Sequence, residues 1–286
     1  MRLVDLSYEL SPSHLACEPR EIRLGDRDRG RMLVVRRDTG DVLHSTVLDL
    51  AEQLTPGDVL VLNNSKSSPG VLKTRTIPVG AQIELRIAFF DGERRAITRA
   101  WPTHFVKEGL TVRTLSGEKL TITEVNIPPH GLCAVEGAIP LLETLKKEGL
   151  PITSFFYKGY WKPEHYHPVY ASAEGSVESP LAGLHFTWHL LDLLKARGVV
   201  VEFVTLHVAG SWLPFLEEES SDHEAPPEEF FVPPETAAAI DRAGIVTATS
   251  RKRRRPTQGP SFRPERPRPA TVSRLRLERS AEWIGR

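Results

Sequence analysis

The stretch VVVEFVTLHVAGS (residues 199–211) decides the class of fold that the sequence predicts. Its nearly continuous apolar part, 199–206, predicts a strand covered on both faces of a sheet. The residues before it predict a helix that begins after Thr187 and ends near Gly198, with Leu190, Leu191 and Leu194 on one apolar face. A helix that leads into a buried strand is typical of an α/β fold. We therefore expect an α/β body with a mixed or parallel sheet.

A second apolar strand, 59–62, also ends in a polar loop, which is Asn63-Asn64-Ser65-Lys66. Ligands of open α/β sheets collect outside the carboxyl ends of the strands, so this loop and the loop 207–211 are both candidate binding segments. A third candidate is SPLAGLHFT (179–187), because unpaired N–H groups at the start of the helix after Thr187 would receive a carboxylate or a phosphate.

The middle of the chain has a different pattern from its two flanks. Short alternating segments such as QIELRIAFF (82–90) and RRAITRAW (94–101) are separated by turns, which predicts a small β-barrel-like domain. We expect the α/β body to comprise 1–69 and 140–250, the inserted β-rich domain to comprise 70–139, and the Arg/Pro-rich segment 251–286 to be a disordered basic tail.

Composition narrows the possible functions. Cys17 and Cys133 are far apart and show no ligand spacing, so we expect neither a disulfide framework nor a metal site. No apolar run has the length of a bilayer-spanning helix, and Asp5 and Glu9 interrupt any secretory signal, so we expect a cytoplasmic protein without a membrane partner. Residues 251–286 carry 12 Lys and Arg against 3 Asp and Glu, whereas the whole chain has 37 of each. The rest of the chain is therefore acidic, and any contact with RNA must be local.

Several polar residues have simpler interpretations than catalysis. A lone histidine such as His185 or His207 often only satisfies backbone groups. Ser65 lacks a partner base in the sequence and is better placed as a binding or turn hydroxyl than as a nucleophile. The pair His165 and His167 favours an exposed loop over a metal site. Asp222-His223 with Glu228 is most simply an exposed acidic loop.

Five segments, taken in order, nevertheless resemble one family. SPLAGLHFT is similar to A-P-T-A-G-L-H-F-T, and FVTLHVAGSW is similar to V-T-L-H-V-G-x-G-T-F. LTPGDVLVLNNSKSSPGVL, HYHPVYA and DHEAPPEEFFVPPETAAAI match further motifs. The family is that of the S-adenosylmethionine:tRNA ribosyltransferase-isomerases of queuosine biosynthesis, and the likeness covers most of residues 1–244.

The resemblance implies a specific reaction. The ribosyl part of S-adenosylmethionine is moved to 7-aminomethyl-7-deazaguanine in tRNA and isomerised to epoxyqueuosine, and no metal takes part. His185 and His207 are then the candidate catalytic acid or base. The implied substrate-binding residues are Asn63, Ser65, Lys66, Gly183, Phe186, Gly210, His223 and Glu228. Phe186 would stack on a base. The expected partners are tRNA and S-adenosylmethionine, and the expected state is a monomer.

The chain departs from the family motifs at several positions. Asn64 replaces an Asp, Val71 replaces an Arg, and Pro226 replaces a His, while the loop 209–212 is one residue short. The motifs stop at about residue 248. The tail after it is either an out-of-frame or lineage-specific replacement or an RNA-binding arm. The alternative function is that of a diverged paralogue that binds nucleotide or RNA without catalysis.

Overall fold

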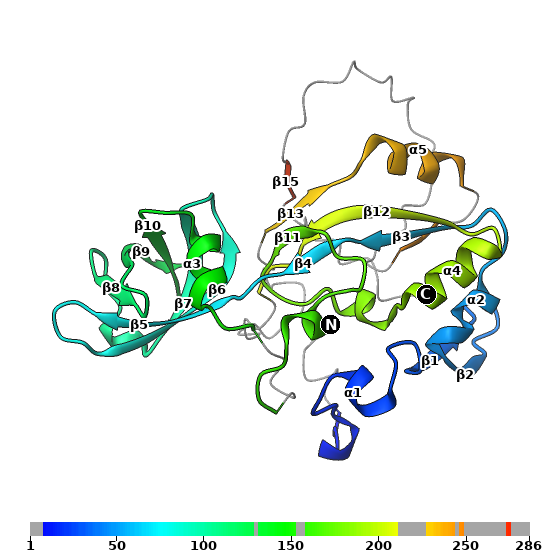
Figure 1. Cartoon of the computed structure of the whole chain (residues 1–286), viewed down its shortest axis with the longest axis horizontal. Helices are drawn as coiled ribbons and strands as arrows, with labels where there is room; N and C mark the ends of the chain where they lie inside the picture. Colours follow the sequence, from blue (N-terminus) through cyan, green and yellow to red (C-terminus); the bar gives the residue numbers. More distant parts are fainter. Residues whose placement is uncertain are drawn as a thin grey trace.

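The computed structural model describes residues 8–128, 131–152, 158–210 and 227–243, together with the backbone of 246–248 and 273–275. The chain forms an α/β body and a β-barrel that projects from it (Figure 1). The expected class, an α/β body with an inserted β-barrel, is thus confirmed.

The barrel is closed and antiparallel, with strand order β10-β7-β6-β5-β8-β9. Its strands are β5 (Val71–Thr76), β6 (Gln82–Phe90), β7 (Arg95–Trp101), β8 (Thr111–Thr114), β9 (Lys119–Ile127) and β10 (Leu132–Gly137). Alternate residues of these strands point inward and form an apolar core that includes Leu72, Leu85 and Ile122. Helix α3 (Leu141–Glu148) contributes Leu141 and Leu145 to the same core. The period-two pattern of the sequence therefore reflects an inner and an outer barrel face.

The body is built on a five-stranded sheet of order β14-β3-β12-β13-β15. The strands are β3 (Val59–Asn63), β12 (Val200–His207), β13 (Glu228–Phe231), β14 (Val246–Ala248) and β15 (Ser273–Leu275). β14, β3 and β12 are parallel, whereas β13 and β15 are antiparallel to their neighbours. β4 (Ser65–Ser67) and β11 (Ala173–Ser176) form a parallel pair next to this sheet, and β1 (Arg31–Val35) with β2 (Val42–Thr46) forms a hairpin. Of the tail 251–286, only β15 lies within the described residues.

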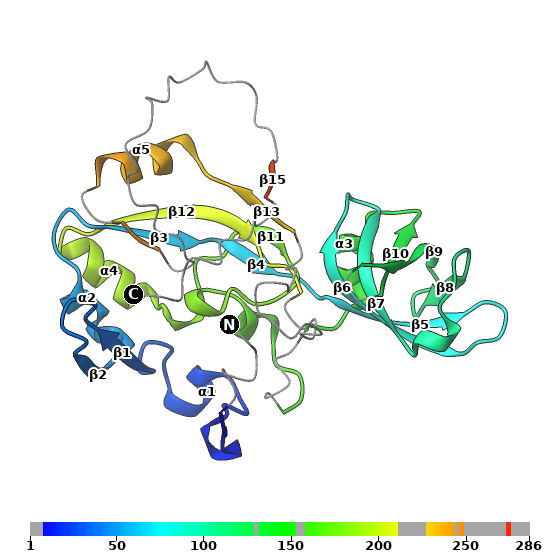
Figure 2. The same ribbon diagram turned by 180° about the vertical axis from the view of Figure 1, so that it is seen from behind.

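Helices cover the two faces of the sheet. α4 (Trp188–Ala196) and α2 (Leu50–Gln53) bury one face, with Leu60 and Leu62 of β3 in the same apolar cluster as Leu190. α5 (Pro234–Arg242) lies on the other face, where the Thr236 hydroxyl donates to the Phe203 carbonyl oxygen. The remaining α-helix is α1 (Arg20–Leu24). Figure 2 shows this layering from behind.

The strand after Gly198 is covered by helices on both faces, as predicted, but it is less buried than its apolar sequence suggests. Every residue of β3 is buried, but β12 is half-buried along most of its length, and Val200 is 41% exposed. Among the described residues, the single helix α5 covers the face of β12 that points away from α4. This limited cover explains why β12 is less buried than β3. The apolar run in the sequence therefore correctly indicated a strand and overestimated its burial.

The start of α4 is closed by groups of the protein itself. The Thr187 hydroxyl accepts from the Leu190 N–H (3.1 Å) and donates to the buried Asp28 carboxylate (2.5 Å). The predicted cap is confirmed, and an internal carboxylate, Asp28, lies at its hydroxyl.

Replacing Thr187 with Ala is expected to lower the free energy of unfolding by about 1–2 kcal/mol, because one cap bond and one partner of a buried carboxylate disappear. Urea unfolding measures the effect. Thr187→Ser keeps the hydroxyl and is the control; an equal loss in both variants would show that the methyl group, rather than the cap, stabilises this site.

Candidate active site

Two of the three predicted segments meet at the carboxyl ends of β3 and β12. These strands are parallel neighbours, and Asn63 lies opposite Val204. The Asn63 side chain bonds the β12 backbone, accepting from the Leu206 N–H (2.9 Å) and donating to the Leu206 carbonyl oxygen (2.8 Å). It also accepts from the Ser65 N–H (3.0 Å). The amide thus fixes the register of the two loops, and its polar atoms are used within the protein instead of facing a substrate.

Ser65 is the centre of a buried hydrogen-bond chain. Its Oγ lies 2.7 Å from Nδ1 of His207 and 2.6 Å from Oγ of Ser176, at the end of β11. Ser176 Oγ in turn accepts from the Val208 N–H (2.9 Å). Ser65 and Ser176 have no exposed surface. No partner base for Ser65 was predicted from the sequence, and the structure corrects this by placing His207 beside its hydroxyl.

The hydrogen-bond chain determines the tautomer of His207 because each hydroxyl has one hydrogen to donate. With Ser176 donating to Ser65, and Ser65 donating to Nδ1 of His207, every buried hydroxyl hydrogen is used. The ring hydrogen of His207 then resides on Nε2. If His207 Nδ1 instead donated to Ser65, and Ser65 to Ser176, the buried Ser176 hydroxyl hydrogen would have no acceptor within this chain. An unsatisfied buried donor costs free energy.

The environment of His207 favours its neutral form. Burial lowers the pKa of His207 below its ordinary value, an effect that Glu229 partly offsets. Gly175 of β11 packs against the ring: a Cβ at this position would lie 2.7–2.8 Å from three ring atoms, which places the imidazole face-on over the glycine. Sequence inspection missed Gly175 and Ser176, since neither belongs to a motif that indicates chemistry.

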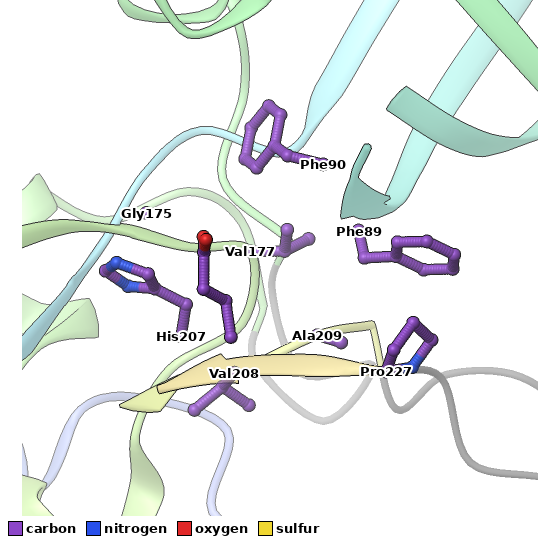
Figure 3. Close-up of a pocket in the computed structure, with 9 residues that line it drawn as sticks. Phe89, Phe90, Gly175, Val177, His207, Val208, Ala209 and Pro227 are labelled. Carbon is purple, nitrogen blue, oxygen red and sulfur yellow. The ribbon is translucent and has the colours of Figure 1, made fainter. Parts of the chain in front are cut away.

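A small pocket adjoins His207 at the junction of barrel and body. His207, Val208 and Ala209 line it from the β12 end, and Phe89 and Phe90 line it from the end of β6 (Figure 3). The Gly210 N–H donates to the Ala88 carbonyl oxygen (2.7 Å), which ties the β12 loop to the barrel. The loop that follows, 211–226, lies outside the described residues, as do the predicted binding residue His223 and the motif position Pro226.

Two charged candidates, Glu228 and Lys66, lie within the described residues. Glu228 is largely buried and accepts from the Ala209 N–H (3.1 Å), and both burial and the nearby Glu178 raise the pKa of its carboxyl group. Glu228 is thus not part of an exposed acidic loop. The Lys66 ammonium is partly exposed and lies 4.0 Å from the Glu174 carboxylate. Lys66 is the predicted residue best exposed to bind an anionic group.

The third segment, AGLHF, has a more structural environment. Phe186 is 4% exposed and packs edge-on against Tyr170, with ring centroids 6.2 Å apart, so its ring is in the core and not available to stack on a base. Gly183 is buried against Pro168 and the Tyr170 hydroxyl. His185 Nδ1 contacts the Arg20 guanidinium. Phe186 and Gly183 thus make packing contacts in the folded chain, and the binding roles expected of them stay predictions.

Burial and the Arg20 charge lower the pKa of His185 to about 4. The folded protein therefore binds fewer protons than the unfolded chain between about pH 4 and 6.5, and the stability that neutral His185 provides above pH 6.5 is lost as the pH falls toward 4. The difference is on the order of 3 kcal/mol.

We expect His185→Asn to lose less stability than the natural chain between pH 7 and pH 4.5 in urea unfolding. His189→Asn is the control, because His189 is exposed on α4. Parallel pH profiles for the natural chain and His185→Asn would contradict a buried neutral His185.

The other histidine pair is not in an exposed loop. His165 Nδ1 lies 2.7 Å from the Glu21 carboxylate, and its side chain is 13% exposed. Burial lowers the pKa of His167. Within the described residues, no group of three or more His, Cys, Asp or Glu is arranged to hold a metal. In the same part of the chain, no helix is both long and apolar enough to cross a bilayer.

The departures from the family motifs have structural explanations at two positions. Asn64 accepts from the Thr205 hydroxyl (2.7 Å), and its backbone oxygen accepts from the N–H groups of Ser172 and Ala173, so it joins β12 and β11. Val71 is buried in the barrel core and pairs with Arg86. An asparagine and an apolar residue therefore suit these positions.

A family model described as queuosine biosynthesis protein matches residues 3–251. The chain belongs to this family. An S-adenosylmethionine:tRNA ribosyltransferase-isomerase from Symbiobacterium thermophilum is 36% identical over 235 residues, and one from Desulforamulus reducens is 32% identical over 235 residues. Each alignment covers 78% of this chain and 65% of the relative, so the chain spans about two thirds of the length of these proteins.

A solved S-adenosylmethionine tRNA ribosyltransferase from Thermotoga maritima is 25% identical, with a TM-score of 0.35, and the match covers 84% of this chain and 67% of that one. Ser65 and His207 both lie within residues 3–251, the part of the chain that the family model matches.

Proposed function

We propose that this chain transfers the ribosyl part of S-adenosylmethionine to 7-aminomethyl-7-deazaguanine in tRNA and isomerises it to epoxyqueuosine, with release of adenine and methionine. Membership of the queuosine biosynthesis family and the activity named for its relatives support the proposal. The observation that carries it is the convergence of the Ser65 loop and His207 at the carboxyl ends of two adjacent parallel strands.

The local chemistry suits His207 as the residue that handles protons. Its lowered pKa keeps the ring neutral near pH 7, and Nε2 carries the hydrogen in the arrangement set by Ser65 and Ser176. A neutral N–H in a partly buried site can stabilise negative charge as it develops on the leaving base. His185 is a weaker candidate for this role, because Arg20 engages its Nδ1 and, together with burial, lowers its pKa to about 4. We therefore assign proton handling to His207 and a positioning role to His185.

Lys66 and Glu228 have complementary roles in this proposal. Lys66 would bind the methionine carboxylate of S-adenosylmethionine, since it is a partly exposed cation on β4. Glu228 would hold the loop after β12 in place through the Ala209 N–H. The proposed reaction uses S-adenosylmethionine as a substrate, requires no metal, and takes place on tRNA in the cytoplasm in a monomeric protein.

Adenine release tests the proposal. The chain is incubated with S-adenosylmethionine and tRNA that bears the deazaguanine precursor, and free adenine and epoxyqueuosine are measured. Both products are expected only when both substrates are present. Binding of both substrates without adenine release would instead establish the alternative, a paralogue that binds without catalysis.

A further inference from the structure

The outer face of the barrel carries a row of like charges on adjacent strands. Arg75 of β5 lies directly opposite Arg113 of β8, and Arg113 lies opposite Lys119 of β9. All three side chains are exposed. Directly opposed like charges destabilise a sheet, because their Cβ atoms are only about 5 Å apart. The fold alone therefore gives no reason for this row.

Within the described part of the chain, these charges have no acidic partner. No carboxylate among the described residues forms an ion pair with Arg75, Arg113 or Lys119. Arg75 donates only to the Gly80 carbonyl oxygen (3.1 Å). Near the start of β7, by contrast, Arg95 pairs with Asp91 and Glu124. The row on β5, β8 and β9 thus differs from Arg95 in having no carboxylate partner among the described residues.

The same face continues across β5, β6 and β7. Cross-strand partners project to the same side, and the pairs Lys73–Glu84, Glu84–Trp101 and Arg86–Arg99 extend the row. Glu84 is the one acidic residue among these partners, and it pairs with Arg86 at 2.8 Å. These residues follow the outer surface of five consecutive strands, from β9 through β8, β5 and β6 to β7. We call this surface the basic barrel face, and its members are Lys73, Arg75, Arg86, Arg99, Arg113, Lys119 and Trp101.

Trp101 adds a second signal. Its side chain is 65% exposed, although tryptophan has more apolar surface to bury than any other residue on this face. An exposed aromatic ring among cations is the arrangement with which proteins bind single-stranded nucleic acid, where rings stack on bases and cations follow the phosphates.

The basic barrel face and the pocket beside His207 are placed so that one RNA strand could contact both. β6 ends at Phe90, which lines the pocket beside His207, and runs back along the barrel past Arg86 to Gln82. At a rise of about 3.3 Å per residue along β6, Arg86 lies roughly 13 Å from Phe90 at the pocket, and Gln82 lies roughly 26 Å from it. Figure 1 shows the barrel pointing away from the body in this direction.

We propose that the basic barrel face binds the sugar–phosphate backbone of the tRNA substrate, with Trp101 stacked on an unpaired base, while the modified base enters the pocket at His207. The inference rests on the proposed function for the identity of the RNA. The acidic character of the rest of the body makes this face the site to which phosphates are drawn.

Salt-dependent binding of the tRNA substrate tests the proposal. The triple variant Arg75→Glu/Arg113→Glu/Lys119→Glu is expected to bind at least tenfold more weakly than the natural chain. Its slope of log affinity against log salt should be smaller by about 2, since each lost phosphate contact removes roughly 0.7–0.9. Trp101→Ala should weaken binding about tenfold with little change in slope. The control Lys195→Glu/Arg197→Glu/Arg242→Glu reverses three exposed charges outside the barrel and should bind like the natural chain after allowance for its net charge.

The outcomes separate this inference from the proposed activity. If the natural chain releases adenine and the barrel variant binds tRNA with unchanged affinity and slope, the basic barrel face is not the docking surface. The same conclusion follows if deleting 251–286 abolishes binding and the barrel variant has no effect. If the barrel variant loses binding but the natural chain never releases adenine, the docking surface stands and the proposed activity falls. Circular dichroism and a thermal melt exclude misfolding, and Arg75→Gln/Arg113→Gln/Lys119→Gln provides a milder variant if the reversed charges unfold the barrel.

Discussion

His207→Asn is expected to lower the rate of adenine release by about 10²–10⁴, the usual contribution of a positioned proton-transfer group. The asparagine amide can still reach the Ser65 hydroxyl from the Nδ1 side, so the buried hydrogen-bond chain and the fold should persist. What disappears is Nε2, which carries the ring hydrogen. Initial rates at saturating tRNA and S-adenosylmethionine measure the effect.

Two controls define what this result means. His189→Asn removes an exposed imidazole from α4 and should leave the rate unchanged. His207→Gln places an amide N–H near the original Nε2 position and should retain more activity than His207→Asn if hydrogen-bond donation is the role of His207. A rate for His207→Asn within about twofold of the natural chain would remove this residue from the mechanism.

Gly175→Ala is expected to reduce activity about as strongly, through the position of His207 and not through its chemistry. The new Cβ would lie 2.7 Å from the imidazole, closer than nonbonded carbon atoms approach, so the ring or β11 must shift. Ser176 follows directly in the chain, so the shift also disturbs the Ser176–Ser65–His207 hydrogen bonds. Since Gly175 has a φ of +145°, the alanine also adds backbone strain of roughly 1–3 kcal/mol.

Gly92 provides the matched control for that strain. It has a φ of +114° in the turn between β6 and β7, and a Cβ there meets no atom within 4 Å. Gly92→Ala should therefore lose stability from strain and keep its activity. If Gly175→Ala and Gly92→Ala differ only slightly in adenine release, contact between Gly175 and His207 has no functional importance.

The regular elements could be predicted because their signals are local. Alternation in QIELRIAFF indicated β6, and Thr187 with its three leucines indicated α4; both follow from which side chains one element must bury. The extent of burial was harder to predict. β12 is half-buried because of what lies on its outer face, and the sequence of the strand does not contain that information.

The candidate site was predicted only in outline. The rule for parallel sheets brought the Ser65 and His207 loops to one edge, yet their hydrogen bond joins residues 142 positions apart. Ser176 is 111 positions from Ser65 and reaches it only because β11 pairs with β4. Conversely, Asn63 and Phe186 match family motifs, but the Asn63 side chain bonds the backbone of β12 and Phe186 packs against Tyr170. Whether a motif residue makes such internal contacts depends on its neighbours in space and not on its residue type.

Resonances of the histidine side chains during a titration with S-adenosylmethionine test the central claim most directly. In protein with isotope-labelled histidine, the imidazole signals of His207 should shift in a saturable way, whereas those of the exposed His44 and His189 should stay in place. Mutation of Ser65 to Ala should alter the His207 signals before any ligand is added. Saturable shifts that leave His207 unaffected would contradict a binding site for the sulfonium nucleoside at the carboxyl ends of β3 and β12.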